Sequence, residues 1–178
     1  MTKLLSEYDF PFLLAIDFES EWKRVLTVVE KHPWLTVEGY FQNEQQYRRY
    51  KIRMGTAASE FKLWQIENWN DKYYLDQIYR SRYWLSQIDS IKSFNYRHTS
   101  YGLKHACENW WGREKSKFGI KDTGSYVANG CLIVAALILE WKFTDTHQGY
   151  RSLNVYFPIS EKSLKRLRAD NLGETEND

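Results

Sequence analysis

The stretch 129–141, NGCLIVAALILEW, constrains the fold more than any other part of the chain. It is apolar on almost every side, and its alanines, leucines and length favour a helix over a strand. A helix that is apolar all round is buried on most sides. Its most apolar part, 131–139, is much shorter than the ~20 residues that cross a bilayer. We therefore expect 129–141 to be the central helix of a core, not a membrane anchor.

Apolar residues at helical spacing predict several more helices. Between Trp22 and Val29 this spacing predicts a first helix that begins at a Ser20 cap and ends at His32. The same spacing predicts helices at 43–54, 57–69, 71–92, 99–111 and 160–169. Caps and glycines bound these segments; Gly112, for example, follows the helix predicted at 99–111.

Four segments are candidates for β-structure. Residues 10–18 indicate a short buried strand, and 34–41 a strand or an irregular connection. Residues 141–144 and 154–159 are expected to pair as a small hairpin. The predicted fold is therefore mainly α: a compact helical domain around a buried central helix, with a small β-hairpin near the C-terminus.

The length of 178 residues suits one domain. We expect it to span 1–170, with possible sub-units at 1–95 and 96–170, before a frayed acidic tail at 171–178. Glu7 and Asp9 stand where a signal peptide would continue its apolar region, so none is expected. Two cysteines are few for a small secreted domain, which favours a reduced, cytoplasmic protein.

Charge and aromatic content limit the classes of function. The net charge of +2 excludes a nonspecific nucleic-acid coat, so any basic binding surface is local. The 8 Trp and 13 Tyr exceed what a core of this size needs, and we expect some of these rings on the surface.

Two short motifs offer candidate chemistry. Residues 119–125, GIKDTGS, have the glycine spacing of a phosphate-binding loop, but no lysine follows Gly124, which favours an ordinary loop. Asp122, Glu140 and Lys142 resemble the D…ExK pattern of Mg²⁺-dependent nucleases, in which the acids bind the metal. That pattern requires a strand before Glu140, whereas the composition there favours a helix with a lysine beyond its end.

The histidines and cysteines do not have the spacing of a zinc site. On a helix, His105 and Cys107 lie about 200° apart and cannot face one ion together. Buried thiols and scattered surface imidazoles are the favoured interpretation of His98, His105, Cys107, Cys131 and His147. We accordingly predict no metal, no cofactor and no catalytic residue, and a protein that is not an enzyme.

Aromatic and basic residues alternate in three stretches, at 47–53, 79–84 and 95–98. Arginine forks bind carboxylates or phosphates, and tyrosine rings supply flat contact area. The alternative is that these are solvated helix faces with half-buried tyrosines. The candidate partner-binding residues are Tyr47, Arg48, Arg49, Arg53, Tyr79, Arg80, Arg82 and Tyr83.

A longer pattern covers 98–112, 124–143 and 154–160: Ser-Tyr-Gly-Leu-Lys-His with a following Glu, then Tyr-Val-x-Asn-Gly before an alanine-rich helix, and a closing strand. It resembles a pattern of short, mostly uncharacterised proteins of plasmids and phages. In such a small fold, Gly102 would allow close helix contact, Asn129 and Gly130 would start the central helix, and the hairpin would cover its end. The resemblance implies an accessory gene of a mobile element, a setting in which small non-enzymatic proteins often block restriction and CRISPR systems.

We therefore expect a binding protein that acts in the cytoplasm of a bacterial host. The favoured function is an anti-defence inhibitor, anti-CRISPR-like or anti-restriction, which occludes a host protein or ribonucleoprotein. The alternative is a small DNA-binding regulator that uses the basic stretches together with the helix at 160–169. The third hypothesis is the Mg²⁺-dependent nuclease. Nucleic acid is thus a possible partner, and a homodimer is a further use for exposed aromatic rings.

Overall fold

The computed structural model describes residues 17–55, 69–118, 124–146 and 152–169. They form a mainly helical fold with two small β-hairpins, which confirms the predicted fold class. In chain order the elements are α1 (Phe18–Lys31), β1 (Leu35–Thr36), β2 (Gly39–Tyr40), α2 (Glu44–Arg53), α4 (Lys72–Leu85), α5 (Ser100–Glu114), a 3₁₀ turn (Lys115–Phe118), α6 (Asn129–Ile138), β3 (Thr144–Asp145), β4 (Val155–Tyr156) and α7 (Glu161–Ala169).

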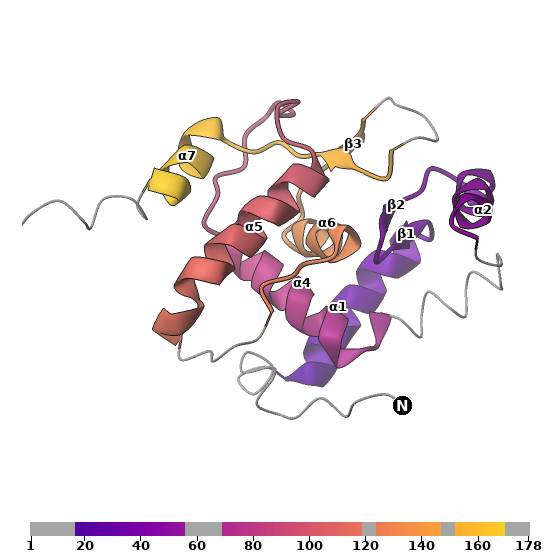
Figure 1. The fold of residues 1–178 in the computed structure, drawn as a ribbon, viewed down its shortest axis with the longest axis horizontal. Helices are drawn as coiled ribbons and strands as arrows, with labels where there is room; N and C mark the ends of the chain where they lie inside the picture. Colours follow the sequence, from indigo (N-terminus) through magenta and orange to yellow (C-terminus); the bar gives the residue numbers. More distant parts are fainter. Residues whose placement is uncertain (1–16, 56–68, 119–123, 147–151, 170–178) are drawn as a thin grey trace, which may run out of the picture.

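Helix α6 is the centre of the molecule, as its all-round apolar surface predicts. It packs most extensively against α4, and also against α1, α5 and β2. In Figure 1 α6 is seen nearly end-on, with α1, α4 and α5 around it. Its residues from Asn129 to Ala136 are buried. The helix ends at Ile138 rather than at residue 141, so the last predicted turn is an irregular connection.

Aromatic residues are divided between the core and the surface. Trp69, Trp84 and Trp111 are among the largest fully buried side chains. Other rings reach solvent, among them Tyr73, Tyr83, Tyr96, Tyr101 and Tyr126. The prediction that some rings lie on the surface is therefore confirmed.

Helix α1 has the predicted end but a different start. Its N-cap is Asp17, whose carboxylate accepts a hydrogen bond from the backbone N of Glu19 at 3.1 Å. Ser20, the predicted cap, instead donates from Oγ to Oδ2 of Asp17 at 2.6 Å. Both residue types are good caps, and the earlier one extends the helix by most of a turn. The helix ends at Lys31, before His32.

Two further helix ends differ from prediction. Helix α4 stops at Leu85 because the following chain pairs with the C-terminal segment: Ile91 donates from its backbone N to Pro158 O at 2.7 Å. Helix α5 continues through Gly112 to Glu114. Gly112 does not have the positive φ of a glycine that ends a helix, so the helix passes through it.

Both β-hairpins are antiparallel; β2 of the first packs against α6, whereas β4 of the second packs against α5. Leu35 pairs with Tyr40 in the first hairpin, which lies within 34–41. Thr144 pairs with Tyr156 in the second, which confirms the hairpin predicted near the C-terminus. The close backbone approach falls at Gly130, where a Cβ would overlap the carbonyl oxygen of Thr36. At Gly102, the predicted contact point, the nearest atom to a Cβ is 3.8 Å away, so that prediction is wrong.

Some predictions fall on residues outside the described ranges. These are nearly all of the strand at 10–18, the helix at 57–69 except its last residue, the tail at 171–178, most of the loop at 119–125, and His147. Within the described ranges, every helix is too short or too polar to cross a bilayer.

Candidate functional site

The predicted binding stretch on α2 lies only partly on the surface. Arg48, Arg49 and Arg53 are exposed. Tyr47, by contrast, is 2% exposed and packs edge-on against Phe41, with ring centroids 5.4 Å apart. The prediction that Tyr47 is a surface contact is therefore wrong, because this ring belongs to the interior.

The stretch on α4 is divided in the same way. Arg80 is 7% exposed, so its predicted surface role is also wrong. Tyr83 is partly exposed and its ring lies 5.7 Å from that of Trp111. Arg82 lies over Tyr79, with the guanidinium carbon 5.4 Å from the ring centroid. Only Tyr79, Arg82 and Tyr83 of this stretch reach solvent.

The three aromatic and basic stretches do not form one continuous surface. Figure 1 shows α2 at the edge of the molecule, apart from α4. In the third stretch, Asn95 donates from Nδ2 to Oε2 of Glu161 at 3.2 Å, and His98 Nε2 lies 2.8 Å from the same oxygen. These two side chains connect the 95–98 segment to the start of α7.

The nuclease residues do not have the required framework. Glu140 and Lys142 follow a helix, α6, where the D…ExK pattern needs a strand. Asp122 lies outside the described residues. Across the described part of the chain, no three His, Cys, Asp or Glu side chains are grouped so that they could hold a metal ion. The described residues therefore give the D…ExK pattern no structural support beyond its residue types.

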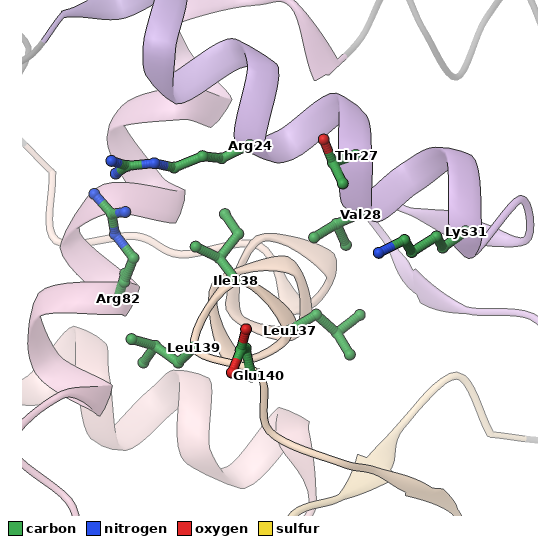
Figure 2. Close-up of a pocket in the computed structure, with 9 residues that line it drawn as sticks. All are labelled: Arg24, Thr27, Val28, Lys31, Arg82, Leu137, Ile138, Leu139 and Glu140. Atoms are coloured by element: carbon green, nitrogen blue, oxygen red, sulfur yellow. The ribbon is translucent and has the colours of Figure 1, made fainter.

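A pocket of about 410 Å³ lies between α1 and the C-terminal end of α6, with α4 at one side (Figure 2). Its lining residues are Arg24, Thr27, Val28 and Lys31 of α1, Arg82 of α4, and Leu137, Ile138, Leu139 and Glu140 at the end of α6. The α1 residues recur at i, i+3, i+4 and i+7, which places them on one helix face. The floor is aliphatic, because four of the nine residues are Val, Leu or Ile.

Three cations and one carboxylate surround this floor. Figure 2 shows the guanidinium groups of Arg24 and Arg82 beside each other, whereas the ammonium group of Lys31 points in from the other end of α1. Glu140 is the single acid of the lining. The pocket is therefore net positive.

The two arginines are held in place by Glu21, which lies under them on α1. Its Oε2 accepts from Nη2 of Arg82 at 3.0 Å and from Nη1 of Arg24 at 3.3 Å. The Glu21 side chain is 1% exposed, whereas that of Arg24 is 55% exposed. One carboxylate is shared by two guanidinium groups, each with several N–H donors, so donors remain for a second anion. Arginine forks of this kind bind carboxylates or phosphates through paired hydrogen bonds.

The residues of the Ser-Tyr-Gly-Leu-Lys-His and Tyr-Val-x-Asn-Gly patterns mainly join parts of the fold. Ser100 Oγ accepts from the backbone N of Val155 at 3.1 Å. Asn129 donates from Nδ2 to Leu153 O at 3.2 Å. Glu108 Oε1 accepts from the backbone N of Val127 at 2.9 Å, and so ties α5 to the start of α6. The two patterns thus lie near each other in the chain because their residues connect α5, the start of α6 and the segment around β4.

Lys104 is enclosed where α5 meets the chain before α6. Its Nζ lies 2.9 Å from Oε1 of Glu108, and 5.3 Å and 4.8 Å from the ring centroids of Tyr101 and Tyr126. Its side chain is 6% exposed, so the charge is satisfied internally and is not presented to a partner.

The pocket was not predictable from the sequence, although two predicted residues, Arg82 and Glu140, line it. Arg24 and Lys31 look like ordinary surface residues of an amphipathic helix. The one sequence signal was an acid, Glu140, directly after an apolar helix, a position that usually favours glycine or a base.

Comparison with known proteins adds no relative: no family model, curated protein or solved structure matches the chain.

Proposed function

We propose that the chain is a non-enzymatic binding protein of a mobile genetic element, which inhibits a defence complex of its bacterial host by occluding part of its surface. The pocket between α1 and α6 is the central contact. The observation that carries the binding proposal is the arrangement of Arg24, Lys31 and Arg82 around an aliphatic floor. The inhibitory part is supported by the resemblance of 98–112, 124–143 and 154–160 to proteins of plasmids and phages.

Charge and shape make the pocket suitable for an acidic protein surface. A partner carboxylate would meet Arg24 and Arg82, which Glu21 already orients, so little side-chain entropy is lost on binding. An aliphatic side chain of the partner would occupy the floor. Arginine next to apolar contact area is typical of the residues that dominate binding energy at interfaces.

The first test compares two charge reversals on α1. Lys31→Glu changes a lysine that lines the pocket, and Lys23→Glu makes the same change at a lysine outside the lining, on the same helix. Arg82 is a poor choice, because its removal would leave the buried Glu21 with fewer partners. Tagged protein is used to recover partners from a bacterial lysate, with and without nuclease, and the recovered proteins are identified by mass spectrometry.

The proposal requires a discrete protein or ribonucleoprotein complex that survives nuclease, is lost with Lys31→Glu and is retained with Lys23→Glu. Inhibition is then measured as the plating efficiency of a phage on a strain whose restriction or CRISPR system targets it. Wild-type protein should raise plating, and Lys31→Glu should not.

Recovery of nucleic acid alone, with binding that weakens steeply as salt rises, would replace this proposal with the DNA-binding function. Equal recovery of the protein partner by wild-type and Lys31→Glu protein would overturn the role of the pocket.

A further inference from the structure

Glu140 has an unusual backbone conformation at the edge of the pocket. Helix α6 ends in a Schellman motif, in which Trp141 donates from its N to Ala136 O at 3.0 Å and Glu140 donates to Leu137 O at 3.0 Å. The residue between the helix and Trp141 must then be left-handed, and Glu140 has φ 60°. It is the only residue other than glycine with positive φ in the described ranges.

A glutamate at this position lowers the stability of the fold for two local reasons. A left-handed conformation is unfavourable for a residue with a Cβ, which is why glycine usually occupies it. A carboxylate also lies unfavourably at a helix C-terminus, where the helix dipole is negative. Glycine would remove both costs. Within the described ranges, no hydrogen bond or ion pair to the Glu140 side chain offsets them.

The same residue is the only acid of the pocket lining. Figure 2 shows its carboxylate at the end of α6, with the guanidinium groups of Arg24 and Arg82 to one side and Lys31 to the other. A residue that is locally unfavourable, exposed and adjacent to a binding pocket is a candidate for selection by function rather than by stability.

We infer that Glu140 determines what the pocket accepts, by binding a lysine or arginine side chain of the partner segment. The docking segment would then carry an acid for Arg24 and Arg82, an apolar side chain for the floor, and a base for Glu140. This inference rests on the proposed function and specifies the chemistry of the partner. It favours a peptide over a nucleic-acid backbone, because Glu140 would repel phosphate groups that approached the same pocket.

The test uses two fluorescein-labelled peptides. One contains a glutamate, two leucines and a lysine in that order, and the other is identical except that glutamine replaces the lysine. Binding is measured by fluorescence anisotropy for wild type, Glu140→Gly, Glu140→Gln and the control Glu30→Gln, an exposed acid of α1 outside the pocket lining. Melting temperatures are measured for the same proteins.

Wild-type protein should bind the lysine peptide about tenfold more tightly than the glutamine peptide, the size expected of one charge-assisted contact. Glu140→Gly and Glu140→Gln should abolish this preference, and Glu30→Gln should keep it. Glu140→Gly should also melt about 2 °C higher, because the left-handed strain is relieved. A variant that gains stability and loses selectivity separates a binding role from a structural one.

The controls distinguish failure of the inference from failure of the proposed function. If Lys31→Glu weakens both peptides but the Glu140 variants change neither, the pocket binds acids and the inference about Glu140 is wrong. If neither peptide binds at millimolar concentration, or Lys31→Glu has no effect on either, the pocket is not the docking site. If a duplex oligonucleotide displaces both peptides, the nucleic-acid alternative takes precedence.

Discussion

Asp76 and Arg80, one turn apart on α4, form an ion pair of 2.7 Å in which both side chains are less than a tenth exposed. Nη2 of Arg80 also donates to Tyr126 O at 3.1 Å, so this pair connects α4 to the chain before α6. The carbonyl of Arg80 accepts from Nε1 of Trp111 at 3.1 Å. An arginine predicted to bind a partner is thus part of the framework.

Removing one member of this pair should be more harmful than removing both. Asp76→Ala leaves the Arg80 charge buried without its carboxylate, and we expect a loss of about 3–5 kcal/mol in the free energy of unfolding. Replacing both residues, as Asp76→Leu with Arg80→Met, should cost clearly less because no buried charge is left unpaired. Urea denaturation of the three proteins measures both values. A double variant less stable than Asp76→Ala would contradict the argument.

The helices were predictable where apolar spacing and a cap coincide. The sequence of α6 is apolar on every face, so its central position followed directly. Helix ends were less predictable because they depend on contacts with residues that are far away in the sequence. Nothing near residue 86 shows that Ile91 will pair with Pro158, and this pairing draws the chain away from α4.

Two glycines provide a matched test of the α6 packing. A Cβ at Gly130 would overlap Thr36 O and lie 2.8 Å from Val37 Cα, and both are backbone atoms that cannot move independently. Gly130→Ala should therefore lower the free energy of unfolding by about 3 kcal/mol or more. Gly102→Ala, in the first turn of α5, would place a Cβ at an ordinary contact distance of 3.8 Å from Thr99 Oγ and should instead stabilise the protein by up to about 1 kcal/mol. Thermal melts compare the two, and equal effects would show that Gly130 is not closely packed.

The candidate site was less predictable than the fold. Tyr47 and Arg82 occur in similar aromatic and basic stretches, yet one is in the interior and the other lines the pocket. Residue type does not decide between these outcomes, because tyrosine and arginine suit both a half-buried helix face and a binding surface. The pocket also combines Arg24, Arg82 and Glu140, which are far apart in the chain and meet only after α1, α4 and α6 have packed.

The two cysteines should be unreactive in the folded protein. Burial raises the pKa of the Cys107 thiol to about 12, and burial likewise raises the pKa of Cys131. Thiolate is the reactive form, so neither side chain should react with a disulfide reagent near neutral pH until the protein unfolds. Absorbance after addition of the reagent, with and without urea, measures this. Rapid reaction of either thiol in native conditions would show that the core around α6 opens readily.

Glu108 should make stability depend on pH in the acidic range. Burial is the largest single influence on the pKa of Glu108, and it raises that pKa. Hydrogen bonds from Lys104 and from the backbone of Val127, together with the nearby Lys104 charge, lower the pKa by more. The pKa therefore lies below its ordinary value of 4.5. A carboxyl group whose pKa is lower in the folded state adds stability that is fully present above 4.5 and is lost as the pH falls through the folded-state pKa. The free energy of unfolding should therefore decrease on acidification, and Glu108→Gln should decrease less. Urea denaturation between neutral pH and about pH 3 tests this, with Glu30→Gln as an exposed control. If wild type and Glu108→Gln lose stability equally, the carboxylate is not what connects α5 to the start of α6.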